Sequence, residues 1–208
     1  MKQRKYAGIL FALLMSLTLL SCAAKQTKKP ELTVESYTEL NTVLKLPPVN
    51  VPGGAWTEAD IQCALYLGAK PFSFPGTFNA MGSKFSVDQK AADFTYTKDN
   101  ELTATLLYDG CACGTVCLTD CPSQEDYFSG FVSTVTFKDL GRSDLPAPAI
   151  FPVAFNGITI GSTAEQVKNN LGTELTVSGA EIRTPHHIIQ LKGSPAEGVT
   201  AITLTYVR

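Results

Sequence analysis

Alternation of apolar and polar residues constrains this chain more than any other feature of its sequence. Leu102–Tyr108 and Ile202–Tyr206 place apolar residues at every second position, and Phe131–Phe137 does so except at Ser133. Most of the positions between them are threonine. Successive side chains of a strand point to opposite faces of a sheet, so this period predicts antiparallel strands with one buried and one wet face. His187–Leu191 continues the pattern.

The helix signals are fewer and shorter. Thr57 with Asp60 three residues later predicts the start of a leading helix. Ser162 with Glu165 forms a capping-box pattern, Val167 and Leu171 lie one turn apart, and Gly172 suits the left-handed position after a helix. A third, shorter helix is expected from Thr77 to Met81.

Two stretches of the chain resemble each other. Pro71–Thr77 can be laid over Gly157–Thr163, and each is interpreted as a short strand followed by a turn and a helix start. Alternating strands follow both copies. We therefore predict an α+β fold of two tandem repeats, each a strand, a helix and antiparallel strands, with the helices on one face of the sheet and the other face exposed.

The N-terminus resembles the export signal of bacterial lipoproteins. Basic residues in Met1–Lys5 precede an apolar run, Tyr6–Leu20, that is too short and poorly flanked for a stable membrane span. Leu19-Leu20-Ser21-Cys22 is similar to the lipobox, which implies cleavage before Cys22 and acylation of its thiol. Two or three acyl chains anchor a protein stably where a single chain does not. The alternative is an ordinary secretory peptide with an accidental Cys22.

These signals divide the chain into four predicted parts. Residues 1–21 are the signal peptide, and 22–54 are the lipidated N-terminus and a tether. Residues 55–140 hold the leading helix and the first repeat with a cysteine-rich hairpin insertion, and 141–208 hold a proline-containing linker and the second repeat.

Charge argues against a nucleic-acid partner. Without residues 1–21 the chain has 14 basic and 19 acidic residues, and no basic cluster. The expected location is the extracytoplasmic side of a cell membrane, facing the cell surface or a periplasm, with a lipid anchor as the membrane contact.

Gly157–Gly172 resembles the G-I-x-h-G-x-T-x-x-x-V-x-x-x-L-G signature of BLIP-like lipoproteins. This group is named after the β-lactamase inhibitory protein and includes the small lipoprotein of the outer-membrane protein assembly machinery. Phe74–Gly82 is similar to the first repeat of tandem members, and the resemblance covers residues 70–207. It implies a fold and a habit of binding proteins with the exposed sheet face, but it implies no catalytic residues and no particular partner.

A cluster of four cysteines, Cys111, Cys113, Cys117 and Cys121, is expected at the tip of a hairpin. Disulfides suit an exported chain, and Cys111 and Cys113 are expected to pair with Cys117 or Cys121 rather than with each other, leaving Cys63 unpaired. A four-thiolate zinc or iron site is the second reading, although the C-x-C-x3-C-x3-C spacing differs from common zinc knuckles. Reduced thiols in an anoxic habitat are the third.

Candidates for catalysis are sparse. His186 and His187, the only histidines, are neighbours that point to opposite sides of a strand, and His187 is expected in the core. No nucleophile-elbow, zincin, Walker or dinucleotide motif occurs, so we expect no enzyme.

The threonines of the wet face form the predicted recognition platform, with Tyr66, Tyr127 and Phe128 as possible aromatic anchors at its edge. The platform residues are Thr95, Thr97, Thr103, Thr105, Thr134 and Thr136. The sequence thus favours a non-catalytic, membrane-anchored module that binds an envelope or extracellular protein. The alternative is a metal-binding or thiol-redox lipoprotein that uses the cysteine cluster.

Overall fold

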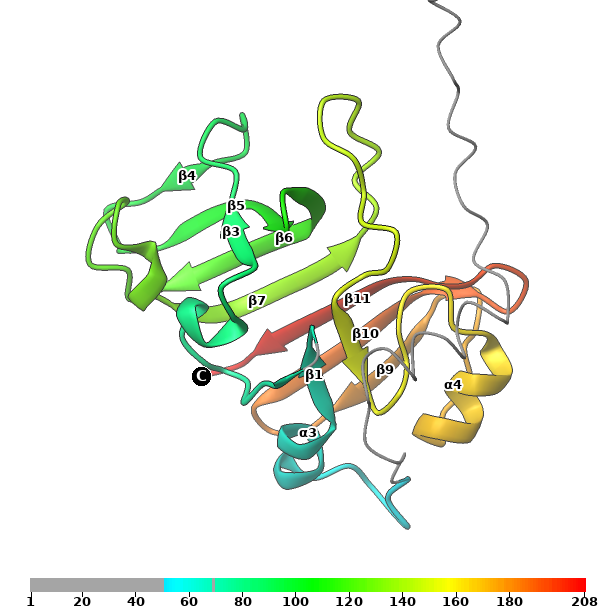
Figure 1. Cartoon of the computed structure of the whole chain (residues 1–208). Coiled ribbons are helices and arrows are strands. Elements are labelled where there is room, and N and C mark those ends of the chain that lie inside the picture. Colours follow the sequence, from blue (N-terminus) through cyan, green and yellow to red (C-terminus); the bar gives the residue numbers. More distant parts are fainter. Residues whose placement is uncertain (1–50, 69) are drawn as a thin grey trace, which may run out of the picture. The chain divides into compact units, whose positions relative to one another are not determined.

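The computed structural model describes residues 51–68 and 70–208, all of which belong to one compact unit, Leu32–Arg208. Figure 1 shows the arrangement of its helices and strands. The predicted signal peptide, the lipidation site Cys22 and most of the tether lie outside the described residues. Within the described part, no helix is long and apolar enough to cross a membrane.

A large antiparallel sheet dominates the fold. Its strands follow the order β3-β5-β6-β7-β11-β10-β9, and β4 pairs with β5 beside β3. They are β3 (Phe85–Val87), β4 (Thr95–Tyr96), β5 (Leu102–Tyr108), β6 (Cys111–Thr119), β7 (Phe131–Lys138), β9 (Ala180–Arg183), β10 (His187–Ser194) and β11 (Gly198–Tyr206). The pairing of β7 with β11, two strands far apart in sequence, makes the sheet continuous.

A second, three-stranded sheet packs on the large one. Its order is β2-β1-β8, from β2 (Lys70–Pro71), β1 (Leu65–Leu67) and β8 (Val153–Phe155). The helices of the described residues are α3 (Glu58–Ala64), α4 (Ala164–Leu171) and the 3-10 turns η1 (Phe78–Met81) and η2 (Tyr127–Ser129). Figure 1 shows both α-helices and the small sheet on one side of the large sheet.

Burial follows the alternation of the sequence. Leu106, Val116, Val135 and Leu204 point to one face of the large sheet and are at most 1% exposed. They share one core with Phe78 of η1 and with the apolar sides of the helices and the small sheet. Burial of apolar surface at about 25 cal/mol per Å² is the main stabilising contribution on this side.

The predicted α+β class of two strand–helix–strand repeats is wrong. The described chain is mostly β, with two α-helices of seven and eight residues and two antiparallel sheets. The small sheet, loops and 3-10 turns cover much of the apolar face where a layer of helices was expected. Few residues of the chain have helical periodicity, so the apolar face is closed by other elements.

The two stretches that define the predicted repeat are not strands. Pro71–Thr77 and Gly157–Thr163 are mainly turns and loops, and the strands β1 and β8 precede them. Phe72, Phe74 and Ile158 are buried, so the apolar residues of these stretches pack loops, not strands, against the core. Asn156 and Gly157 have positive φ, and the resulting turn lets Phe155 and Ile158 exchange backbone hydrogen bonds of 2.8 and 2.9 Å.

The helix signals are largely confirmed. Thr57 caps α3 in a reciprocal capping box with Asp60. The cap of α4 lies one residue later than predicted, because Thr163 with Gln166 forms the box while the Ser162 hydroxyl accepts a hydrogen bond from the Thr159 amide. Gly172 ends α4 at φ 68°, as predicted.

Candidate functional site

Two rows of short polar side chains cross the wet face of the large sheet. The strand register aligns Thr103 with Cys117, Thr134 and Thr205, and it aligns Thr105 with Thr115, Thr136 and Thr203. Side chains directly opposite each other on neighbouring strands lie on the same face, at a strand spacing of about 4.8 Å. We call these eight residues the threonine face.

Most of the threonine face is accessible. Thr103 is exposed, and every other member except Thr105 is half-buried. The Thr136 and Thr203 hydroxyls are 3.0 Å apart, and the Thr103 hydroxyl is 3.5 Å from the Cys117 sulfur. These cross-strand contacts hold neighbouring side chains in fixed positions, and β-branched threonines are already stiff at χ1.

Two of the predicted platform residues do not belong to the accessible part of the threonine face. Thr105 is 2% exposed, and its hydroxyl donates a 2.8 Å hydrogen bond to Asp93. Thr97 lies in the turn between β4 and β5, where its hydroxyl accepts from the Asp99 amide at 3.3 Å. The sequence reading missed Thr115, Thr203 and Thr205, although all three have the same alternation as their neighbours.

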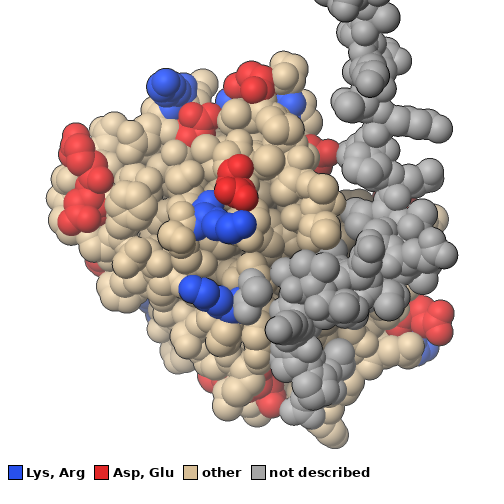
Figure 2. Space-filling model, viewed as in Figure 1, with Lys and Arg blue, Asp and Glu red and all other residues tan. Residues whose placement is uncertain are grey.

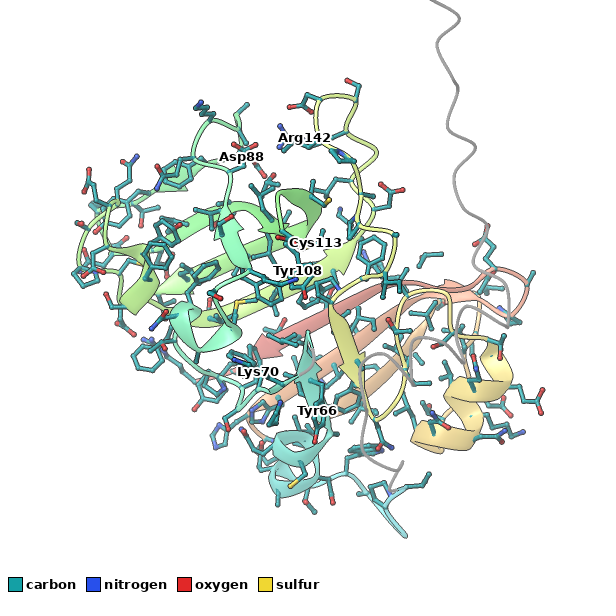
Figure 3. All side chains as sticks on the ribbon, viewed as in Figure 1. Tyr66, Lys70, Asp88, Tyr108, Cys113 and Arg142 are labelled. Atoms are coloured by element: carbon teal, nitrogen blue, oxygen red, sulfur yellow. The ribbon has the colours of Figure 1, made fainter. Side chains whose placement is uncertain are left out.

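The loop that covers Thr105 is held by an ion pair. The Arg142 guanidinium donates to Asp88 at 2.8 Å and also contacts Asp144. Figure 3 shows Asp88 and Arg142 facing each other from the loops after β3 and β7. One end of the threonine face is therefore closed by described residues.

The opposite end opens into a groove of about 490 Å³. Its lining comes from the ends of β6, β7 and β11 and from two loops. The lining residues are Pro75, Glu101, Thr119, Asp120, Phe131, Val132, Ser133, Thr134, Tyr206 and Arg208. Because Thr134 belongs to both, the groove and the threonine face form one continuous surface.

Backbone hydrogen bonds hold both loops that border the groove. On one border, the Val132 amide donates to the Gly76 carbonyl at 2.9 Å and the Phe78 amide donates to the Gly130 carbonyl at 2.8 Å. On the other border, the Cys121 amide donates to the Asn100 carbonyl at 3.0 Å. The groove is thus formed by anchored segments.

One exposed large apolar side chain, Phe131, lines this groove. Among the described residues, the exposed large hydrophobic side chains are Val51, Phe128, Phe131, Val177 and Val207. Phe131 lines the groove at 45% exposure, and Val207 lies between the lining residues Tyr206 and Arg208. Phe128 is 44% exposed and stacks on Tyr127 at a ring distance of 4.1 Å.

Of the three predicted aromatic anchors, only Phe128 is available. Tyr127 is 5% exposed and packs edge-on against Phe78 at 5.4 Å. Tyr66 is half-buried in β1 of the small sheet, away from the threonine face. The better anchor is Phe131, because its neighbour in register is Thr119 of the groove.

The cysteine segment is not a hairpin tip. Cys111–Thr119 is strand β6, in the interior of the large sheet, and Cys121 follows it. Gly114 lets β6 approach β7 closely, because a Cβ at this position would lie 1.8 Å from the Thr136 carbonyl oxygen. Residues read as an insertion are therefore part of the core sheet.

The four cysteines point in different directions. Cys113 is fully buried and lies 3.5 Å from the Leu106 carbonyl, and burial raises the pKa of its thiol to about 12. Cys117 lies on the threonine face. Burial, followed by the nearby Asp120 and Asp126 carboxylates, raises the pKa of Cys121. Raised thiol pKa values oppose thiolate chemistry at Cys113 and Cys121.

All five described cysteines are free thiols, Cys63 on α3 included. Cys113 and Cys117 are about 13 Å apart along a strand that rises ~3.3 Å per residue, whereas bridged cysteines have Cα atoms within about 7 Å. A disulfide in this segment stays a prediction and would require β6 to move. Within residues 51–208, no three His, Cys, Asp or Glu side chains come close enough to hold a metal ion.

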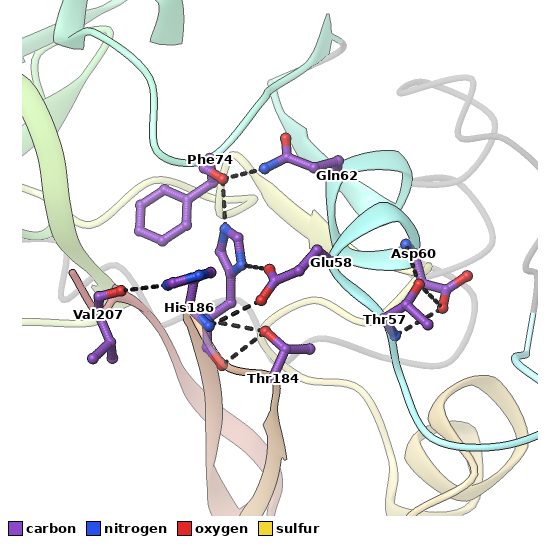
Figure 4. A network of polar contacts seen from close by, with 9 residues as sticks. Thr57, Glu58, Asp60, Gln62, Phe74, Thr184, His186 and Val207 are labelled. Carbon is purple, nitrogen blue, oxygen red and sulfur yellow. Dashed lines mark hydrogen bonds and ion pairs between the residues drawn. The ribbon is translucent and has the colours of Figure 1, made fainter.

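His187 occupies the predicted core position and is 3% exposed. Its Nδ1 contacts the Glu58 carboxylate and its Nε2 lies 2.7 Å from the Phe74 carbonyl oxygen, as Figure 4 shows. Burial raises the pKa of Glu58, but hydrogen bonds from the His186 amide, Thr184 and His187 outweigh it and lower this pKa overall. Every bonding position of the His187 ring is used inside the protein.

Charge on the visible face of the molecule is mixed. Figure 2 shows no broad basic area there, and several basic side chains lie beside acidic ones. The pairs include Lys84 with Asp109 at 3.2 Å. This distribution agrees with the absence of a basic cluster in the sequence.

Comparison with known proteins adds no relative: no protein-family model, no curated protein and no solved structure matches the chain. The resemblance to BLIP-like lipoproteins therefore stays a prediction.

Proposed function

We propose that this protein is a membrane-anchored, non-catalytic interaction module that binds a protein of the envelope or the extracellular space. Its binding surface is the threonine face together with the groove at the ends of β6, β7 and β11. The lipobox-like Leu19–Cys22 supports the anchor, and the sheet supports the binding role.

One observation carries the binding role. An accessible, preordered sheet face adjoins a groove lined by Phe131, one of the five exposed large apolar side chains of the described residues. Apolar side chains exposed beside a concave surface are typical of recognition sites. Stiff threonines lose little side-chain entropy on binding, which favours affinity.

The test of binding compares surface variants of the full chain in affinity capture from envelope extracts. Thr136→Lys and Thr203→Lys place a long charged side chain on the threonine face, and Asn169→Lys is the control on α4, which packs on the opposite side. We expect a protein that is retained by the wild type and by Asn169→Lys and lost with both threonine variants. Equal retention by all four proteins would remove the threonine face from the proposal.

The anchor has its own test. We expect Cys22→Ala to move the protein from the membrane fraction to the soluble fraction and to abolish labelling by radioactive fatty acid. Membrane retention of the variant at wild-type level would contradict lipid anchoring at Cys22.

A further inference from the structure

We propose that the groove at the ends of β6, β7 and β11 takes an extended peptide segment of a partner protein, with a lysine or arginine next to an apolar residue. This inference rests on the proposed function and specifies the chemistry of the partner. It concerns the groove alone, so it can fail while binding by the threonine face stands.

The size and lining of the groove fit one or two side chains. A volume of about 490 Å³ lies in the range of 300–1,000 Å³ typical of ligand pockets. Pro75, Phe131 and Tyr206 provide apolar surface, and Ser133 and Thr134 provide hydroxyls. The Ser133 hydroxyl already donates to the Cys117 carbonyl at 3.1 Å, so it presents an acceptor to a ligand.

Phe131 is the groove residue that we expect to contact the apolar residue of the peptide. Its ring is 45% exposed although it begins β7, a strand whose other apolar side chains are buried. The backbone bridge between Thr77 and Phe131 fixes its position against the neighbouring loop. An aliphatic or aromatic side chain in the groove would cover this ring and remove its apolar surface from water.

The charges around the groove favour a lysine or arginine in the peptide. Glu101 and Asp120 line it, and within residues 51–208 Glu101 has no ion-pair partner. Arg208 is the one basic lining residue, and it already donates to Thr119 at 3.0 Å and pairs with Asp120. A cation near Glu101 would therefore meet an unpaired carboxylate, at a site where Asp126 adds negative charge behind Cys121.

The same charges disfavour two other occupants. An anionic lipid surface would be repelled by Glu101 and Asp126, since like charges oppose association. A second copy would bring a second acidic groove toward the first in a symmetric dimer. A basic and apolar segment is the occupant that matches both kinds of lining residue.

The experiment uses three synthetic ten-residue peptides in a Gly-Ser background, each with one central pair: Arg-Leu, Glu-Leu or Arg-Gly. Each is fluorescently labelled and titrated with the full-length protein in detergent at low salt. We expect the Arg-Leu peptide to bind at least tenfold more tightly than either of the others. Raising the salt concentration to about 0.5 M should weaken its binding, because salt screens exposed charges.

Variants then locate the binding. Glu101→Lys and Phe131→Ser should each weaken binding of the Arg-Leu peptide at least tenfold, while Asp99→Lys, an exposed carboxylate outside the groove lining, should leave it within twofold. Asn169→Lys, on the exposed side of α4, should also leave it within twofold. Circular dichroism and thermal unfolding confirm that each variant is folded.

Several results would overturn the inference. These are equal binding of the Arg-Leu and Glu-Leu peptides, or unchanged binding with Glu101→Lys or with Phe131→Ser. Concentration-dependent dimerisation in light scattering that Phe131→Ser abolishes would assign the groove to a second copy. Binding of the Cys22→Ala protein to anionic vesicles that Phe131→Ser abolishes would assign it to a membrane.

Discussion

The His187 site and the groove are two places where aromatic and charged side chains meet at the same end of the large sheet. At the first, His187 is buried and contacts the Glu58 carboxylate and the Phe74 carbonyl, which come from α3 and from the loop after β2. At the second, Phe131 and Glu101 lie open to solvent. Both sites combine a ring with a carboxylate, but only one has unused bonding capacity.

The difference separates a structural site from the proposed binding site. A buried polar group must find its partners inside the protein, because leaving it unpaired costs about 1–3 kcal/mol. An exposed carboxylate and an exposed ring bear no such cost and remain available to a ligand. Substitutions at His187 should therefore change stability, and those at the groove should change binding.

The largest effect is expected from His187→Leu. Leucine fills the space but leaves the Glu58 carboxylate and the Phe74 carbonyl without the ring as a donor, so we expect the free energy of unfolding to fall by about 3 kcal/mol. His187→Gln is the control, because its amide still donates one hydrogen bond and should cost less. Urea denaturation measures both, and a loss below about 1 kcal/mol with leucine would class His187 as dispensable.

Glu58→Gln should have the next largest effect, about 1.5 kcal/mol near neutral pH, because the Glu58 side chain is 37% exposed and partly screened. The lowered pKa of Glu58 also predicts a pH dependence. The unfolded chain binds the proton more readily, so this stabilisation is full above the ordinary value of 4.5 and is lost as pH falls through the lower folded value. Wild type and variant should converge in acid, and a constant difference between pH 3 and 7 would contradict this.

A smaller effect is expected from the cap that positions Glu58. Thr57→Ala removes the capping box at the start of α3 and should cost about 1 kcal/mol. Thr57→Ser is the matched control and should cost less than half as much. Thermal unfolding followed by circular dichroism tests the pair, and equal melting temperatures would show that the cap does not stabilise α3.

The smallest change is expected at the groove. Phe131→Ser should alter the free energy of unfolding by no more than about 0.5 kcal/mol, as is usual for exposed positions. Phe78→Ser, in the buried ring cluster beside it, is the contrast and should destabilise by several kcal/mol. A loss of more than about 2 kcal/mol with Phe131→Ser would make this ring part of the core.

Local features of the fold were predictable because short-range chemistry decides them. Thr57 with Asp60 and Gly172 after Leu171 mark helix ends through bonds made within four residues. Alternation in β5, β10 and β11, and in β7 from Thr134 onward, separated the buried face from the threonine face. At the start of β7 the prediction is wrong, because a register shift between Cys117 and Leu118 accompanies an exposed Phe131 and a buried Val132. The position of His187 in the core followed from its side of the strand.

Errors arose where the same pattern had two physical uses. The alternation in Pro71–Thr77 and Gly157–Thr163 predicted strands. In the structure it buries side chains of two loops, one of which contains Pro75 and the other of which follows the turn at Asn156. We predicted that Cys111–Cys121 forms an insertion at a hairpin tip, because a strand of small residues and a loop have similar composition. Only the neighbouring strands β5 and β7 show that this segment is central.

By itself the sequence determined which side chains face inward along most of the strands and, to within one residue, where the helices begin and end, since these depend on neighbours a few residues away. Tertiary structure alone decided which strands pair, and with them the composition of the threonine face and the groove. The β7–β11 register joins Thr136 to Thr203, and the His187–Glu58 contact spans 129 positions. Such contacts depend on the closure of long loops and the packing of the whole core, which no local pattern encodes.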